Sequence, residues 1–163
     1  MNVRKLTTLA LLTAAALVMF VIELQIPAPI PVPGVKLGLS NIVTLAVLCL
    51  FGWKEALAVL LVRIGLGAIV TGQVGALPYA LAGGLLSFGV MLLLKQVIRD
   101  RQLWVLSVVG GFFHNLGQLG MAILITRTPG LVAYLPVLLL SGMAAGLFTG
   151  LCAQPVVRHF KHR

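Results

Sequence analysis

Long apolar segments, separated by short clusters of charged residues, constrain the fold of this chain more than any other feature. Hydrophobic residues make up 60% of its 163 positions and charged residues only 9%, which is too little polar surface for a water-soluble domain of this size. The uncharged segments reach membrane-spanning length, and this favours helices over the weak alternating pattern of a transmembrane barrel. The sequence therefore predicts an all-α integral membrane protein.

We expect a six-transmembrane-helix bundle that forms a single transmembrane domain over residues 1–163. The expected spans cover residues 6–22, 38–51, 55–70, 78–94, 103–126 and 131–157. The basic start of the chain followed by an apolar segment also suits a cleaved signal peptide. That segment reaches spanning length before Glu23, so we expect it to be retained as the first helix.

The basic residues indicate the orientation of this bundle. With a cytoplasmic amino terminus, most of them fall inside: Arg4, Lys5, Lys54, Lys95, Arg99, Arg101, Arg158, Lys161 and Arg163. Lys36 and Arg127 would lie outside. By the positive-inside rule both termini are cytoplasmic, in a multi-pass protein of the cell membrane surrounded by lipid. Topology thus explains the net charge of +9 without nucleic acid as a partner.

Residues 24–37 form a proline-rich connection between the first two spans. Its prolines alternate with other residues: Pro27, Pro29, Pro31 and Pro33. Because proline fixes φ and removes a backbone donor, neither a helix nor a paired central strand can run through it. Lys36 lies near its end, just before a helix-start signal at Ser40 and Asn41. We expect a stiff extracellular loop that closes over a binding site.

Arg63 lies near the middle of the third expected span, where an uncompensated cation costs roughly 2.5 to 3.5 kcal/mol on insertion scales. Its neighbours at helical spacing, Val59 and Gly67, offer no counter-charge. Three interpretations remain open. Arg63 forms a structural ion pair with Glu23, lines a substrate cavity, or extends toward a membrane surface.

His114, Asn115 and Gln118 form the densest polar cluster within the expected spans. His114 and Gln118 are four residues apart and share a helix face. Such residues can join helices by hydrogen bonds, helped by the neighbouring glycines, or they can line a ligand site. We favour the ligand site, because three polar side chains within five residues exceed what packing usually requires. A lone histidine without a carboxylate in its span is poor evidence for a proton relay.

Ala10 and Ala14 form a small-xxx-small pair on the first expected helix. Such a pair lets another helix approach closely, either within this protein or from a partner. Cys49 and Cys152 lie inside apolar segments without metal-ligand spacing around them, and we expect them to be packing residues.

Signatures of soluble enzymes do not occur in the sequence. We find no glycine-rich phosphate loop, no aspartate-rich motif for a metal diphosphate and no nucleophile with an evident base. The acids are Glu23, Glu55 and Asp100, too few and too scattered to hold magnesium. We therefore predict no metal, no cofactor and no independent catalysis.

Two runs carry a resemblance to a known family: Pro33-Gly-Val-Lys-Leu-Gly-Leu-Ser-Asn-Ile-Val-Thr44 and Gly110-Gly-Phe-Phe-His-Asn-Leu-Gly-Gln118. They resemble heptaprenyl diphosphate synthase component I, also called the Gx transporter family. That family in turn looks like the substrate-binding S components of energy-coupling-factor transporters. The resemblance implies a small-molecule site under extracellular loops, a transmembrane coupling subunit and cytoplasmic ATPases. It also implies that Ala10 and Ala14 contact the coupling subunit.

These observations lead to one preferred hypothesis, a substrate-binding subunit that captures a small organic molecule of anionic, aromatic or isoprenoid-like character from outside. The candidate substrate-binding residues are Lys36, Asn41, Arg63, His114, Asn115, Gln118 and Arg127. One alternative is a non-catalytic membrane component of a heptaprenyl or other polyprenyl diphosphate synthase. Another is a transporter that works without an ATPase.

Overall fold

The computed structural model describes residues 3–25, 38–98 and 102–161. These residues form six α-helices and two short 3-10 helices, and no strand occurs among them. The α-helices are α1 (Val3–Gln25), α2 (Leu39–Leu50), α3 (Trp53–Thr71), α4 (Leu77–Leu94), α5 (Leu103–Thr126) and α6 (Leu135–Lys161). The 3-10 helices η1 (Val74–Ala76) and η3 (Pro129–Tyr134) lead into α4 and α6. The prediction of an all-helical protein is confirmed.

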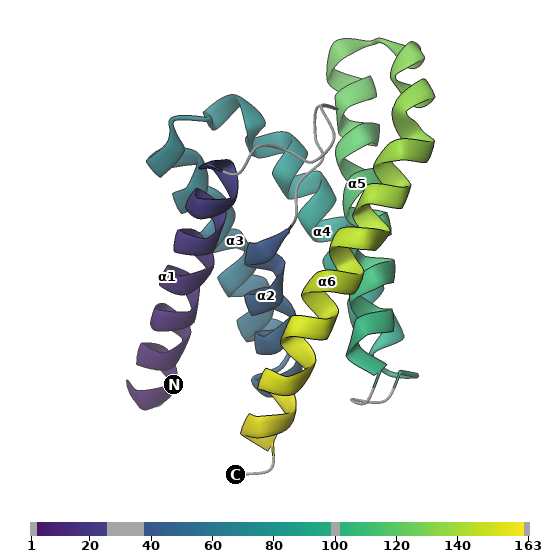
Figure 1. Cartoon of the computed structure of the whole chain (residues 1–163). Helices are drawn as coiled ribbons and strands as arrows, with labels where there is room; N and C mark the ends of the chain where they lie inside the picture. Colours follow the sequence, from purple (N-terminus) through teal and green to yellow (C-terminus); the bar gives the residue numbers. More distant parts are fainter. Residues whose placement is uncertain (1–2, 26–37, 99–101, 162–163) are drawn as a thin grey trace.

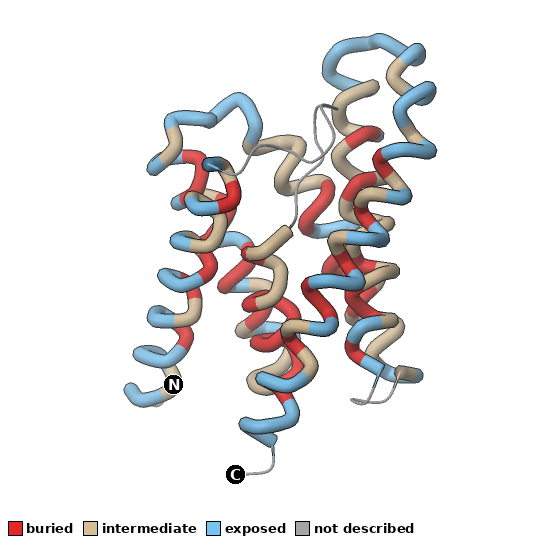
Figure 2. Tube along the Cα trace, in the orientation of Figure 1, coloured by how far each residue is buried: buried red, intermediate tan, exposed pale blue. Residues whose placement is uncertain are grey.

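Four helical stretches are long and apolar enough to cross a membrane: Val3–Gln25, Val74–Leu94, Leu103–Thr126 and Pro129–Lys161. Large apolar side chains cover their outer surfaces, and Leu11 of α1 and Leu124 of α5 are 67% and 72% exposed. Figure 2 shows exposed residues along the outer faces of α1, α5 and α6. Such surfaces would be unfavourable in water but suit lipid. The protein is therefore membrane-embedded.

Successive helices run in opposite directions, so the two termini lie at the same end of the bundle (Figure 1). Side-chain contacts connect the helices at this end. Lys5 at the start of α1 forms an ion pair with Glu55 at the start of α3. Lys95, directly after α4, donates a hydrogen bond to the carbonyl of Leu48 near the end of α2. Arg127, directly after α5, lies at the opposite end.

Helix α2 is a short helix enclosed by the others. Its 12 residues correspond to about 18 Å at the α-helical rise, against a hydrocarbon core of about 30 Å. Residues 43–49 are all buried, as expected for a helix that is apolar on every side. It packs against α1, α3 and α6, and it begins part-way along the bundle (Figure 1). The first turn of α2 therefore lies inside the molecule.

Helices α4, α5 and α6 pack through glycines that allow the backbones to meet. A Cβ added to Gly111 of α5 would lie 2.1 Å from the carbonyl oxygen of Gly142 in α6. One added to Gly146 would lie 2.4 Å from the Ser107 oxygen, and one at Gly83 of α4 would lie 2.6 Å from the His114 oxygen. Small residues at such spacing are typical of close helix pairs in membranes. This side of the bundle is therefore packed backbone to backbone.

Candidate functional site

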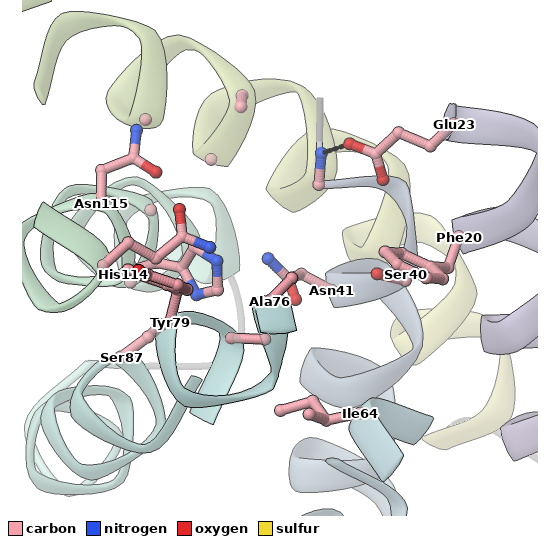
Figure 3. A pocket seen from close by; sticks show the side chains of 18 of the residues that line it. Phe20, Glu23, Ser40, Asn41, Ile64, Ala76, Tyr79, Ser87, His114 and Asn115 are labelled. Carbon is pink, nitrogen blue, oxygen red and sulfur yellow. Dashed lines mark hydrogen bonds between the residues drawn. The ribbon is translucent and has the colours of Figure 1, made fainter. Parts of the chain in front are cut away.

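A cavity of about 580 Å³ lies inside the bundle, and residues from all six α-helices line it (Figure 3). Its volume falls within the range of roughly 300 to 1,000 Å³ that is typical of small-molecule sites. Apolar side chains such as Leu45, Ile64 and Leu77 cover much of its wall. The polar groups gather in two places, one at the start of α2 and one on α4 and α5.

Arg63 of α3 lines the cavity beside the first turn of α2. Its side chain is only 8% exposed. The Nη1 group donates to the hydroxyl of Ser40, and Nη2 donates to Oδ1 of Asn41 over 3.3 Å. Both acceptors are uncharged, and the buried Nε has no hydrogen-bond partner. The guanidinium is therefore held in place by uncharged acceptors and keeps an unused donor at Nε.

Glu23 of α1 also lines the cavity, but other donors occupy its carboxylate. The backbone N–H groups of Gly38 and Leu39 donate to its two oxygens, the second over 3.1 Å, and Figure 3 shows the first of these bonds. Glu23 therefore caps the positive end of α2. Among the described residues no ion pair involves Arg63, so the direct Arg63–Glu23 pair does not form. Extension to a surface is also ruled out, because Arg63 is buried.

The second polar group lies across the cavity from α2. His114 and Gln118 of α5 and Tyr79 of α4 line this wall. Figure 3 shows His114 and Asn41 pointing toward one another from opposite sides. These side chains provide hydrogen-bond donors and acceptors. The cavity thus has a wall with Arg63 and a second polar wall, with apolar surface between them.

Asn115 lies next to these residues and also connects two helices. Its Nδ2 donates to the carbonyl of Leu138 in α6 over 2.5 Å and contacts the hydroxyl of Ser141 at 3.5 Å. Asn115 is buried and lines the cavity as well. Both interpretations of the polar cluster on α5 therefore apply to this residue, which joins helices and contributes to the wall.

Five candidate residues from the sequence line this single cavity: Asn41, Arg63, His114, Asn115 and Gln118. Arg127 does not, because it is exposed at the far end of α5. Lys36 and most of the proline-rich connection lie outside the described residues, so the predicted covering loop stays a prediction. Ala10 and Ala14 are exposed on α1, away from the cavity.

Comparison with known families gives one match. The family described as heptaprenyl diphosphate synthase component I matches residues 12–156. The chain belongs to this family. Searches of curated proteins and of solved structures returned no match. The resemblance seen in the sequence is confirmed at the level of the family, and the matched residues include the entire cavity wall.

Sequence reasoning about this family member missed several polar residues of the wall. Ser40 was expected only as a helix cap, yet it accepts a hydrogen bond from Arg63. Ser107 and Thr149 line the cavity and share a hydrogen bond of 2.8 Å between α5 and α6. Tyr79 was not predicted as a residue of the binding site. A search for hydroxyl side chains inside apolar segments would have found all four.

The arrangement is suited to recognition of a ligand. It offers one buried cation, several neutral hydrogen-bonding groups and extensive apolar surface, the usual composition of a small-molecule site. Within the described residues, no group of three or more His, Cys, Asp and Glu side chains gathers to hold a metal ion. The chemistry that these residues support is binding and orientation.

Proposed function

We propose that this protein is the substrate-binding membrane subunit of an energy-coupling-factor-type transporter and captures a small anionic, aromatic or isoprenoid-like molecule. The observation that carries the proposal is the cavity of about 580 Å³ with Arg63 buried in its wall, bound to two uncharged acceptors and in no direct ion pair with a described residue. A buried charge without a direct ionic partner is unfavourable. A bound anion would supply that partner.

In this proposal the two termini are cytoplasmic, the protein lies in the cell membrane and the cavity opens to the outside. The distribution of charge supports this orientation. Basic residues gather at the end of the bundle that holds the termini, namely Arg4, Lys5, Lys54, Lys95, Arg158 and Lys161. The positive-inside rule places such an end in the cytoplasm. The start of α2, where Arg63 binds, faces the other way.

The coupling subunit would bind to the outer face of α1. Ala10 and Ala14 are exposed there, and the apolar side chains of Leu11 and Val18 flank them. A small-xxx-small pair on an apolar face allows a partner helix to approach closely. Transport would then require this membrane partner and cytoplasmic ATPases that hydrolyse ATP.

The partner is tested by co-purification of the tagged chain from its own membranes. Ala14→Trp should abolish recovery of a transmembrane subunit and ATPases, because the indole would fill the space for the partner helix. Ala58→Trp is the matched control, since Ala58 is also exposed but lies on α3. Equal recovery with both variants would contradict this interface.

Uptake is tested by mass spectrometry of the growth medium around cells that express the chain. We expect at least one small organic molecule to be depleted in an ATP-dependent manner, and Arg63→Gln should abolish the depletion. Glu55→Gln, at the far end of α3, should leave it unchanged. Depletion that proceeds without any ATPase would instead support a transporter that acts alone.

A second candidate function follows from the family name, which describes a component of heptaprenyl diphosphate synthase. In this role the chain would be a non-catalytic membrane component that associates with a soluble prenyltransferase. This hypothesis predicts co-purification with that enzyme and loss of chain elongation when the membrane chain is removed. Recovery of ATPases in place of a prenyltransferase would exclude it.

A further inference from the structure

We infer that the ligand of this cavity is a small organic acid with a single carboxylate, which binds with its acid group at Arg63. The inference rests on the proposed substrate-binding function and specifies the class of substrate. It follows from the unused N–H groups of Arg63 and from the polar residues placed opposite.

The guanidinium of Arg63 has capacity for one more acceptor. It carries five N–H groups, and the structure assigns one from Nη1 to Ser40 and one from Nη2 to Asn41. Nε is buried without a partner. Guanidinium and carboxylate form paired, charge-assisted hydrogen bonds, which are stronger than bonds between neutral groups. A carboxylate would therefore replace or supplement the weak neutral acceptors on this residue.

The cavity wall carries one formal positive charge, on Arg63, and one formal negative charge, on Glu23. The Glu23 carboxylate accepts hydrogen bonds from two backbone N–H groups at the positive end of α2 and makes no direct ion pair with the guanidinium among the described residues. A carboxylate of the ligand would give Arg63 the direct anionic partner that these contacts do not supply. A diphosphate would carry excess negative charge into a buried site beside the Glu23 carboxylate, which is strongly unfavourable.

The rest of the ligand must suit the opposite wall. His114, Gln118 and Tyr79 provide hydrogen-bonding groups there, and Leu45 and Ile64 add apolar surface along the cavity. The complementary molecule has a carboxylate at one end, a compact apolar body and a polar group at the other end. A long isoprenoid chain with a charged diphosphate lacks this distribution.

The test uses the full-length chain, purified from its own cells in mild detergent as wild type, Arg63→Gln and Arg63→Lys. Bound molecules are released with solvent, treated with acidic methanol and identified by mass spectrometry, so that each methyl group gained reports one carboxyl group. We expect a molecule with one carboxyl group on the wild type. Arg63→Gln should retain about 10- to 100-fold less of it, the usual effect of losing a charged hydrogen bond. Arg63→Lys should retain an intermediate amount, because the charge remains but the planar fork is lost.

A second measurement adds geranyl diphosphate to the loaded wild-type protein, and we expect no displacement of the bound acid. Release by geranyl diphosphate, a bound molecule without a carboxyl group, or equal retention by folded Arg63→Gln would overturn the monocarboxylate inference and leave the binding function standing. Elution profiles and the fluorescence of Trp53 and Trp104 establish whether each variant is folded. If the wild type carries no small molecule and depletes none from the medium, the proposed function fails, and the inference fails with it.

Discussion

Helices α4, α5 and α6 pack through glycines, whereas α1, α2 and α3 pack through side chains. In the first group the backbones of Gly111 and Gly142 approach so closely that neither can carry a side chain. In the second group even the tightest glycine, Gly67, faces the ring of Phe20 at a distance of 3.1 Å from its would-be Cβ, a neighbour that can move. The α4–α6 half is therefore the more rigid wall of the cavity.

The two halves also differ in how their polar groups are satisfied. In the α4–α6 half, Asn115 binds the Leu138 carbonyl and Ser107 binds Thr149. In the α1–α3 half, Arg63 is in no direct ion pair with a described residue and keeps an unpartnered Nε. Ionisable groups in unfavourable environments of this kind occur most often at functional sites. One side of the cavity is therefore rigidly packed, and the other side holds the groups that are available to bind a ligand.

The largest effect should come from the glycine contacts. Gly111→Ala places a methyl group 2.1 Å from the Gly142 oxygen, and we expect a loss of about 3 kcal/mol or more, since backbone atoms must separate. Unfolding in detergent, followed by fluorescence, measures it. Gly120→Ala on the same helix meets no atom within 4 Å and should be neutral or slightly stabilising. Similar losses for the two variants would mean that the backbone contact of Gly111 is not what stabilises the packing of α5 on α6.

Arg63→Met should increase the stability of the ligand-free protein, in contrast to Gly111→Ala. Replacing a buried guanidinium that binds only uncharged acceptors by an apolar side chain of similar length should stabilise the ligand-free protein by about 1 to 3 kcal/mol, while ligand retention is lost. Arg63→Lys keeps the charge and should give no such gain. Thermal unfolding of the ligand-free proteins provides the comparison. A destabilised Arg63→Met variant would show that this arginine is mainly structural.

Glu23→Ala should have a smaller effect that is confined to α2. Two backbone N–H groups would lose their acceptor and the positive end of the helix would lose its counter-charge, at a cost of about 1 to 2 kcal/mol. Hydrogen exchange in the first turn of α2 should accelerate, while exchange in α5 should not change. Glu23→Gln keeps an acceptor and should lie between wild type and alanine. Uniform acceleration across all helices would argue against a local cap.

The smallest effect should come from the ion pair between Lys5 and Glu55. Their side chains are 36% and 20% exposed, and exposed pairs typically contribute less than about 1 kcal/mol. A double-mutant cycle with Lys5→Ala and Glu55→Ala measures the coupling between the two side chains. A coupling of several kcal/mol would mean that this end of the bundle is as firmly held as the glycine contacts.

The sequence was sufficient to predict the helical class, since charge spacing and hydropathy depend little on tertiary packing. It also marked Arg63 and the polar cluster on α5, because polar groups in apolar segments are costly wherever they lie. It did not indicate which helix would bind Arg63. That depends on how deep α2 begins in the bundle, and depth follows from packing between distant segments.

The position of Arg127 relative to the cavity likewise depends on the packing of distant segments. It was expected near the site because it follows a span on the same side as the proline-rich connection. Helix α5 has 24 residues and α2 only 12, so the residue after α5 lies well beyond the level at which α2 begins.

In contrast, the close approach of α5 and α6 had a signal in the sequence. The glycines at 142, 146 and 150 are spaced four residues apart, which is typical of tight helix contacts.

The short length of α2 affects the order in which the protein assembles during synthesis. Twelve residues are too few to be inserted as an independent span, and the groups that satisfy its ends belong to other segments. Glu23, at its amino-terminal end, is synthesised before it, but Lys95, at its carboxyl-terminal end, follows more than 40 residues after Leu50. During synthesis the second helix of the chain is therefore incomplete until the fourth has emerged.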